Sequence, residues 1–318
     1  MNPTLAEEIF CDDMPTTEET WAHLRAALAP ATVIRRDEPL ARRTTLRVGG
    51  PADFLVEPAG EEELSVLLKF CRRQDLPVFV LGRGSNLLIR DGGIRGVVIS
   101  LAHADFSRIE IEGTILRCGA GARLKQVAVE ARRAGVSGLE FLEGIPGSVG
   151  GALRMNAGAM GAATGDVVES IRLMDFEGRV SERGRSEVPW TYRSCPLLRE
   201  QIALGAVLRG QALERDEIAA RMAAFSRKRW DTQPAAPSAG CIFKNPETIP
   251  AGKLIDELGL KALRVGGASV SLEHGNFIVN DGTASAADVL QLIGRLQEKA
   301  REARGIDLRT EVEIVGEA

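Results

Sequence analysis

Two glycine-rich segments carry the residue types and spacing that most directly suggest chemistry. The first, GRGSN at residues 82–86, directly follows the apolar run PVFVL at residues 77–81. Glycines let the backbone turn tightly, and successive exposed N–H groups in such a turn form an anion-binding concavity. Arg83 adds positive charge, and Ser85 and Asn86 add side-chain donors. The segment therefore predicts a loop that holds phosphate.

The second segment, GIPGSVGGALRMNAGAMG, spans residues 144–161. It interleaves closely spaced glycines with small and polar residues, namely Gly144, Gly147, Ser148, Gly150, Gly151, Asn156 and Gly158. One glycine-rich loop alone is typical of a tight turn between strands. Two of them favour backbone that wraps closely around a large phosphate-bearing ligand, such as a nucleotide or a flavin.

The first loop matches neither common nucleotide-binding motif. The dinucleotide-binding turn of a Rossmann fold needs a third glycine three residues after Gly84, where this chain has Leu87. A Walker loop needs Gly-Lys followed by Ser or Thr, which this loop lacks. The residues alone therefore predict a phosphate-bearing ligand and leave its identity open.

The cysteines and histidines predict no metal site. The five cysteines are scattered and form no CxxC pair, and the three histidines do not cluster either. These residues are Cys11, Cys71, Cys118, Cys195, Cys241, His23, His103 and His274. Zinc sites and disulfide frameworks both need closely spaced ligands or an even, regularly spaced set of cysteines. The pattern favours a reducing compartment, and we expect a cytoplasmic protein.

Composition describes an ordinary globular protein of two or three domains. The 318 residues are 44% hydrophobic and 26% charged, with a net charge of -4. A net negative charge and only 4% aromatic residues argue against nucleic-acid binding. Residues 1–15 lack the basic start of a signal peptide, and no run of about 18 apolar residues predicts a membrane-spanning segment.

Apolar spacing predicts the elements that position the two segments. Helices are expected at residues 19–29, 61–74, 123–135, 214–230, 251–258 and 285–303, and strands at residues 53–58, 77–82, 96–101, 167–175, 202–210, 276–280 and 310–315. Thr16 and Glu19 have the spacing of a capping box for the first helix. Strands and helices mix without strict alternation, which predicts an α+β fold. The Pro-rich stretch at residues 232–240 suggests a domain boundary.

Longer motifs connect the chain to a known family. TTLRVGGPADFLVEP, LGRGSNLLIRDGG, GIPGSVGGALRMNAGAMG, YRSCPL, PSAGCIFKNP and LRTEVEIVG occur in the order that one family shows. Over residues 32–318 the chain resembles the UDP-N-acetylenolpyruvoylglucosamine reductases, flavoenzymes that complete UDP-N-acetylmuramate for peptidoglycan and so for cell wall, shape and division. The single tyrosine, Tyr192, belongs to the YRSCPL motif, so the chain resembles the shorter form without an extra tyrosine-bearing loop.

The resemblance implies a two-part FAD-binding domain of the vanillyl-alcohol-oxidase type, followed by an α+β substrate-binding domain. On that pattern residues 1–31 form a tail and the start of the first helix region, 32–108 and 109–212 form the two FAD-binding subdomains, and 213–318 bind substrate. FAD is bound non-covalently, and the residues that line it are Thr45, Gly82, Arg83, Gly84, Ser85, Asn86, Leu87, Ile145, Gly147, Ser148, Val149, Gly150, Asn156 and Gly158.

The same resemblance implies the reaction and its catalytic residues. Hydride passes from NADPH through FAD to C3 of the enolpyruvyl group, and C2 then needs a proton. Arg193 matches the catalytic arginine, whose guanidinium can bind a carboxylate through two bonds, and Glu311 matches the catalytic glutamate. Spacing alone does not separate Glu311 from Glu313, which points the same way along a strand.

Cys241 departs from the family pattern, because a serine usually donates the proton to C2 at this position. A thiol is a stronger acid than an alcohol, so we expect Cys241 to take that role, although most cysteines are simply buried small hydrophobic residues. A thiol here also predicts sensitivity to alkylation or peroxide. Cys195 likewise stands where serine is common, and we expect it to pack near Arg193.

Five further residues match positions that contact the UDP-sugar substrate, namely Tyr192, Arg229, Lys244, Asn245 and Lys261. A solvated helix end explains Arg229 equally well. Two alternative functions remain open: another FAD oxidoreductase of the same fold, and a non-catalytic flavin-binding homologue. We expect a monomer or weak oligomer whose only partners are small molecules.

Overall fold

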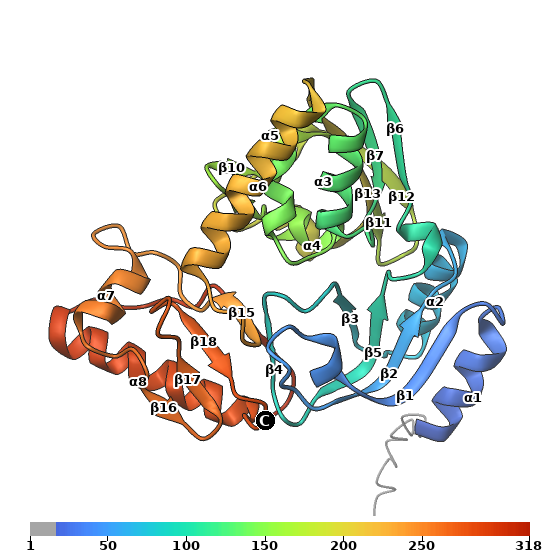
Figure 1. The fold of residues 1–318 in the computed structure, drawn as a ribbon. Coiled ribbons are helices and arrows are strands. Elements are labelled where there is room, and N and C mark those ends of the chain that lie inside the picture. The colour runs from blue at the N-terminus through green and yellow to red at the C-terminus, as the bar shows by residue number, and fades with distance from the viewer. Residues whose placement is uncertain (1–16) are drawn as a thin grey trace, which may run out of the picture.

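The computed structural model describes residues 17–318 and consists of three bodies, which Figure 1 shows side by side. Strands and helices occur in all three, so the expected α+β fold is confirmed. The first helix, α1 (Thr17–Ala27), begins two residues before the expected start and buries Leu24. The expected capping residue Thr16 lies outside the described residues.

The first body is a four-stranded sheet with the order β1-β2-β5-β3. Its strands are β1 (Val33–Pro39), β2 (Pro51–Glu57), β5 (Ile94–Ser100) and β3 (Val78–Leu81). Helix α2 (Glu61–Arg73) connects β2 to β3 and buries Leu64, Leu67 and Leu68, whose helical spacing predicted it. Strands β2 and β3 both run parallel to β5, so their carboxyl ends meet at one edge of the sheet. The GRGSN loop begins at that edge.

The second body is a five-stranded antiparallel sheet with the order β12-β11-β13-β7-β6. Its strands are β12 (Val180–Gly184), β11 (Val168–Asp175), β13 (Gln201–Arg209), β7 (Ile115–Gly119) and β6 (Ile109–Glu112). Sequence spacing predicted β11 and β13 but not the other three. Those three have at most five residues, which is too short for a clear alternating pattern.

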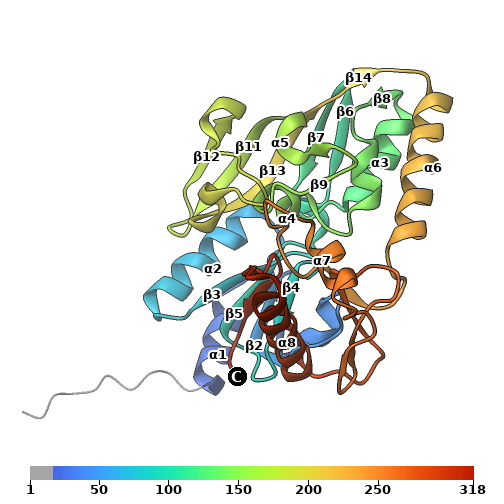
Figure 2. The same cartoon turned by 90° about the vertical axis from the view of Figure 1, so that its left-hand side faces the viewer.

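Four helices accompany this sheet, namely α3 (Leu124–Arg133), α4 (Val149–Arg154), α5 (Thr164–Val167) and α6 (Arg215–Thr232). Helix α6 lies along the second body beside α3, as Figure 2 shows, and buries Ile218 and Met222 in the same core. The boundary between residues 212 and 213 stays a prediction, and the packing of α6 favours a boundary after this helix.

The third body is a four-stranded sheet with the order β15-β18-β17-β16. Its elements are β15 (Ser238–Cys241), α7 (Ala251–Glu257), β16 (Arg264–Val265), β17 (Ala268–Val270), β18 (Phe277–Asn280) and α8 (Ala286–Arg304). Ser285 and Asp288 form a capping box at the start of α8, and Gly305 ends it in a left-handed conformation. Leu292 and Leu296 of α8 are buried in a core of this body.

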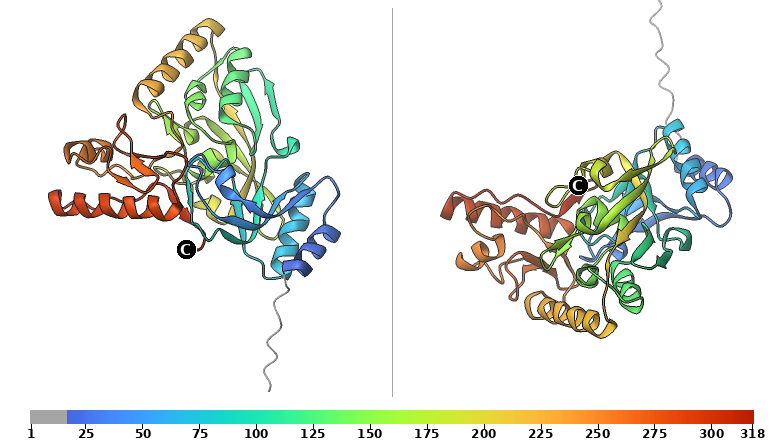
Figure 3. Two further views of the ribbon diagram at one scale, coloured as in Figure 1. Left: turned by 60° about the horizontal axis from the view of Figure 1, so that its bottom comes forward. Right: turned by 90° about the horizontal axis from the view of Figure 1, so that it is seen from above.

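Strand pairing and helix capping are among the contacts that join the third body to the first. Strand β19 (Glu313–Val315) leaves the third body and pairs in parallel with β4 (Leu87–Ile89), directly after the GRGSN loop. The carboxylate of Asp91 accepts hydrogen bonds of 2.8 and 2.9 Å from the backbone N–H groups of Ala286 and Ala287 at the start of α8. Figure 3 shows α8 extending outward from this junction.

Two short strand pairs complete the fold. Strand β9 (Gly158–Ala159) pairs with β10 (Ala162–Ala163), and β8 (Val136–Ser137) pairs with β14 (Gln211–Ala212). Single turns of 3-10 helix lie at Leu40–Arg43, Ala104–Phe106, Glu140–Gly144, Arg185–Glu187 and Pro196–Arg199. Within residues 17–318 no helix is both long and apolar enough to cross a membrane.

Candidate active site

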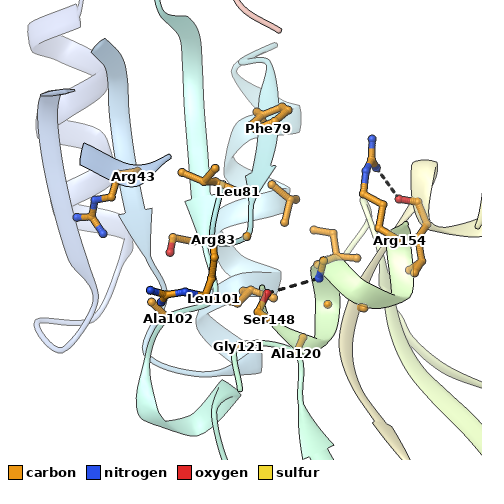
Figure 4. A pocket seen from close by; sticks show the side chains of 18 of the residues that line it. Arg43, Phe79, Leu81, Arg83, Leu101, Ala102, Ala120, Gly121, Ser148 and Arg154 are labelled. Carbon is orange, nitrogen blue, oxygen red and sulfur yellow. Dashed lines mark hydrogen bonds between the residues drawn. The ribbon is translucent and has the colours of Figure 1, made fainter. Parts of the chain in front are cut away.

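A cavity of about 660 Å³ lies between the first and second bodies. Figure 4 shows its lining, with Arg83 beside Leu101 and Ala102, and Ser148 at the start of α4. Pockets for cofactors and small ligands typically have volumes of about 300–1,000 Å³. Five residues predicted to hold the cofactor line it, namely Thr45, Gly82, Arg83, Ser148 and Gly150.

The two glycine-rich segments lie against each other in the wall of this cavity. A Cβ atom added at Gly82 would stand 3.4 Å from the Ser148 hydroxyl oxygen. Gly84 has a φ of +59°, and a Cβ there would stand 2.3 Å from the Arg43 carbonyl oxygen. Only glycine fits this close approach without strain. The Thr45 N–H donates to the Gly84 carbonyl at 3.2 Å, which fixes the loop against the preceding segment.

Several lining residues were missed from the sequence. They are the side chains and backbone at the carboxyl ends of β3 and β5 and at the start of β13, including Phe79, Val80, Ser100, Leu101, Ala102, Gln201, Ile202 and Ala203. Ligands of open sheets with parallel strands bind beyond the carboxyl ends of those strands. That rule, applied to the two predicted strands at residues 77–82 and 96–101, was the available signal for the first five.

The other nine predicted cofactor residues do not line the cavity. They are Gly84, Ser85, Asn86, Leu87, Ile145, Gly147, Val149, Asn156 and Gly158. Val149 and Leu87 are buried in hydrophobic cores. Asn156 uses its side chain within its own body, donating to the Thr191 carbonyl and accepting from the Gly165 N–H. These residues shape the two loops, and their contact with a cofactor stays a prediction.

The polar groups in the cavity suit a phosphate-bearing cofactor such as FAD. Burial lowers the pKa of Arg83, and the nearby guanidinium of Arg123 lowers it further. Neither arginine pairs with a carboxylate of the described residues. Two adjacent cations without a counter-charge are favourable for an anion. In addition, the Gln201 side-chain oxygen is buried and has no hydrogen-bond partner within residues 17–318, so a ligand can satisfy it.

Arg193, Cys241 and Glu311 come together outside the lining of this cavity, close in sequence to its lining residue Glu313. More than a hundred residues separate Arg193 from Glu311. The Arg193 Nε atom lies 2.9 Å from Glu311 Oε1, in an ion pair that is largely shielded from solvent. This contact does not have the geometry of a hydrogen bond: the Arg193 Nε atom is buried and has no hydrogen-bond partner within residues 17–318. Another guanidinium nitrogen of Arg193 donates to the Gly158 carbonyl at 3.2 Å. Both Arg193 and Glu311 act electrostatically on Cys241.

Burial sets the protonation of this group. Burial and the nearby Glu311 carboxylate raise the pKa of the Cys241 thiol to about 11, although Arg193 opposes the shift. Burial also raises the pKa of Glu311, and this effect outweighs the opposing charges of Arg193 and Lys244. The thiol therefore keeps its proton at neutral pH, as a proton donor must. Because the thiolate is the reactive form, the same shift predicts slower alkylation of Cys241 than of an ordinary thiol, and its sensitivity to alkylation stays a prediction.

The structure distinguishes Glu311 from Glu313 by their surroundings, which sequence spacing alone could not do. The carboxylate of Glu313 pairs with Arg154 at 2.8 Å, and both residues line the cavity. The carboxylate of Glu311 instead faces Arg193 and acts on Cys241. Glu311 precedes β19, so the alternation of the strand does not govern where its side chain points.

Asn276 is a residue of this site that the sequence did not indicate. Its side-chain oxygen accepts from the Phe243 N–H at 2.9 Å, and its amide nitrogen donates to the Phe243 carbonyl at 2.8 Å. Its backbone carbonyl accepts from the Ile242 N–H at 2.8 Å. A hydrogen bond from the Asn276 side chain also favours the thiolate form of Cys241, which lowers the pKa of that thiol. Asn276 thus holds the segment that follows Cys241.

The predicted substrate residues have different surroundings. Tyr192 is 63% exposed, and the Arg193 guanidinium lies 5.6 Å from its ring centre. Lys244 lies close enough to Glu311 to affect its pKa. Both therefore belong to the group around Arg193.

The other three predicted substrate residues have partners within the protein. The Asn245 side chain accepts from the Ala251 N–H at the start of α7. Lys261 pairs with Asp256 at 2.9 Å. Arg229, at the end of α6, donates to the Gly144 carbonyl at 2.6 Å and so contacts the second glycine-rich segment rather than solvent alone.

Two further predictions concern cysteines and metals. Cys195 is buried, and its N–H donates to the Arg154 carbonyl at 2.9 Å, next to the Arg193 loop. Burial raises the pKa of its thiol. No cluster of three or more potential metal ligands exists among residues 17–318.

Comparison with known proteins agrees with this architecture. The family model described as FAD binding domain matches residues 52–183, and that of the UDP-N-acetylenolpyruvoylglucosamine reductase C-terminal domain matches residues 233–315. The crystal structure of such a reductase from Thermus caldophilus superposes with a TM-score of 0.77 at 42% identity, covering 89% of this chain and 98% of that one. The expected FAD-binding domain followed by a C-terminal domain is therefore confirmed.

Two curated relatives align over nearly the whole chain. The UDP-N-acetylenolpyruvoylglucosamine reductase of Geobacter metallireducens is 47% identical over 301 residues, which cover 94% of this chain and 99% of the relative. That of Bacillus subtilis is 41% identical and covers 88% of this chain and 93% of the relative. Together with the cavity and the three side chains near it, these matches show that the chain belongs to the UDP-N-acetylenolpyruvoylglucosamine reductase family.

Proposed function

We propose that this chain reduces UDP-N-acetylglucosamine enolpyruvate to UDP-N-acetylmuramate in peptidoglycan precursor synthesis, with NADPH as the hydride donor. The observation that carries the proposal is the meeting of Arg193, Cys241 and Glu311 near a cavity that suits FAD. When bound there, FAD supplies hydride transfer from NADPH to C3 of the enolpyruvyl group. The protein's own residues must then manage charge and one proton.

Arg193 has the position and charge to bind the substrate carboxylate. Negative charge spreads from C2 into that carboxylate as C3 gains hydride, and a guanidinium can hold two carboxylate oxygens at once. Its ion pair with Glu311 fixes the guanidinium in place. Because the pKa of Glu311 is raised, its carboxyl group takes up a proton more readily than an exposed one. On protonation Glu311 gives up the ionic part of its contact with Arg193, and its carboxyl group can then donate a hydrogen bond and adds no negative charge.

Cys241 provides the proton in this scheme. Its S–H bond breaks as a C–H bond forms at C2, which leaves a thiolate on the protein. The nearby Arg193 guanidinium and the hydrogen bond from Asn276 both favour that thiolate. A proton from water then restores the thiol. Positioned proton donors of this kind contribute roughly 10²- to 10⁴-fold to reaction rates.

Lys244 is the best-placed cation for the substrate, because it acts on Glu311. Tyr192 offers an exposed ring beside Arg193 for the same ligand. The side chains of three other predicted substrate residues, Asn245, Lys261 and Arg229, already have partners within the protein. To contact the substrate, each must release its partner or bind both. The proposal also includes a cytoplasmic location and a monomer or weak oligomer, which fractionation and size-exclusion chromatography test.

The test is an anaerobic titration of the purified yellow protein followed in its visible spectrum. We expect NADPH to bleach the flavin absorbance and UDP-N-acetylglucosamine enolpyruvate to restore it in proportion to the amount added. Restoration must fail with UDP-N-acetylglucosamine, which lacks the enolpyruvyl group. Bleaching without restoration by the enolpyruvyl substrate contradicts the proposed substrate.

A further inference from the structure

Asn86 lies between the cofactor loop and the catalytic carboxylate. It ends the GRGSN loop, yet its side-chain amide donates to the backbone carbonyl of Glu311 at 3.1 Å, across 225 residues of sequence. The second amide hydrogen faces the Met155 sulfur at 3.6 Å. An asparagine amide has two hydrogens to donate, and both are used here. The side chain therefore contacts the catalytic segment, not the cavity.

The bond to Glu311 stands outside the strand pairing that surrounds it. Strand β19 starts at Glu313, whose N–H donates to the Asn86 carbonyl at 3.0 Å, and the ladder with β4 continues from there. Glu311 precedes this ladder, so strand pairing provides no donor for its carbonyl. The Asn86 side chain provides that donor.

The opposite side of the same peptide segment is held by the Cys241 region. The Glu311 N–H donates to the Ile242 carbonyl at 2.7 Å, and Ile242 directly follows Cys241. A continuous set of contacts thus runs from the cofactor loop through Asn86 to Glu311 and on to Cys241. Each contact fixes the backbone from which a catalytic side chain projects.

We propose that Asn86 is a positioning residue that fixes the backbone of Glu311 relative to the cofactor loop, so that the Glu311 carboxylate meets Arg193 and Cys241. The inference rests on the proposed function and adds a role that differs from cofactor contact. Its loss leaves the loop glycines in place and frees the Glu311 carbonyl. Misplacement of a catalytic group by about 1 Å can lower a rate by about 10²-fold.

The experiment compares Asn86→Ala with Asn280→Ala. Asn280 makes the same kind of bond between the third and first bodies, donating to the Leu46 carbonyl at 3.0 Å, but away from Glu311. The readouts are bound FAD per protein, the rate of flavin reduction by NADPH, and the rate of reoxidation by the enolpyruvyl substrate. For Asn86→Ala we expect reoxidation to slow about 10- to 100-fold while FAD content and reduction rate stay within about twofold. Asn280→Ala is expected to lower thermal stability and leave the ratio of the two rates unchanged.

Asn86→Asp adds a pH readout that a merely structural residue would not produce. An ionised aspartate cannot donate to the Glu311 carbonyl, whereas a protonated one can. We therefore expect its reoxidation rate, relative to the unmodified protein at the same pH, to rise as the pH falls from 8 to 5. The same ratio for Asn86→Ala is expected to stay flat.

The outcomes separate this inference from the proposed function. If the unmodified protein is reoxidised by substrate and Asn86→Ala matches it, the positioning role is wrong and the function stands. Equal slowing of both half-reactions, or loss of FAD, also overturns the positioning role. If the unmodified protein is reduced by NADPH but never reoxidised by substrate, the proposed function fails and the role built on it fails too.

Discussion

The cofactor cavity and the catalytic group are neighbouring sites built in opposite ways. In the cavity, the two glycine-rich segments contribute backbone and small residues such as Gly82, Gly150 and Gly151, and larger side chains complete the lining. The proposed catalytic group consists of three side chains, Arg193, Cys241 and Glu311, which only the assembled fold brings together. A site made of backbone fails when atoms are added, and a site made of side chains fails when atoms are removed. The two regions therefore respond to opposite kinds of substitution.

The largest expected effect tests the side-chain site. Cys241→Ala removes the proposed proton donor and should slow reoxidation by the enolpyruvyl substrate about 10²- to 10⁴-fold. Reduction by NADPH should continue, because it needs no proton from this side chain. Cys241→Ser restores a donor and is expected to keep substantial turnover. Rapid-mixing absorbance of the flavin measures both steps, and full turnover by the alanine variant would show that the proton comes from elsewhere.

The next effect tests the backbone site by adding one methyl group. Gly84→Ala places a Cβ 2.3 Å from the Arg43 carbonyl oxygen, whereas Gly113 has a similar φ of +57° with open space around it. We expect Gly84→Ala to lower the free energy of unfolding by about 2–5 kcal/mol, from backbone strain plus overlap. Gly113→Ala, with strain alone, should lose about 1–2 kcal/mol.

Denaturant unfolding and FAD content measure this pair of variants. Only Gly84→Ala should also lose FAD during purification, because only Gly84 belongs to the cofactor loop. Equal losses of stability in the two variants would mean that the close approach at Gly84 is relieved by a small shift of the loop.

The pH dependence of thiol labelling tests burial at the catalytic group. With a pKa of about 11, roughly one Cys241 in 10⁴ is ionised at pH 7. A thiol with the ordinary pKa of about 8.5 would be roughly 3% ionised. Alkylation by iodoacetamide should therefore be about 300-fold slower than for an ordinary thiol, and should accelerate about tenfold per pH unit up to pH 10.

Mass spectrometry of labelled peptides identifies the cysteine that reacts, with Cys241→Ser as the blank. The raised pKa values of the buried Cys71 and Cys118 thiols, both about 12, keep those residues slower still. Rapid labelling of Cys241 at pH 7 would show that the thiol is exposed and ionised, and would remove the basis for its role as a proton donor.

The smallest effect concerns the support of the side-chain site. Asn276→Ala leaves the buried Phe243 N–H and carbonyl groups without their partners, at a cost of about 1–3 kcal/mol. Because Asn276 also stabilises the Cys241 thiolate, reoxidation should slow further than this loss of stability explains. Asn280→Ala removes a comparably buried amide that is not among the groups acting on the Cys241 thiol. It is the control for a loss of stability without a direct effect on Cys241.

The contrast between the sites also explains what sequence predicted. The GRGSN loop and the segment at residues 144–161 are local patterns, so their role in a phosphate-bearing site could be read from neighbouring residues. The residues at positions 201–203 and Asn276 carry no local signal, because their place in the site depends on how β13 and β18 pair with distant strands. Glu311 and Glu313 are chemically identical in sequence and differ only in what lies opposite them.

Helices and strands were also predictable where the local sequence pattern is clear, and were missed where distant contacts determine them. The helices α2, α3, α6, α7 and α8 were expected within about three residues of their bounds, and the apolar spacing is clearest in α2 and α8. Strands such as β4, β16 and β17 have three residues or fewer, and tertiary pairing rather than local propensity determines them.

The pairing of β4 with β19 has a consequence for synthesis of the protein. Residues 87–89 leave the ribosome early, but their partner strand at residues 313–315 follows more than two hundred residues later. Contacts this distant in sequence form slowly, and domains fold in order as the chain is made. The nascent FAD-binding body must therefore keep one side of its cofactor loop unpaired throughout translation. Glu311 lies two residues before that strand, so the proposed catalytic group assembles at the same late stage of synthesis.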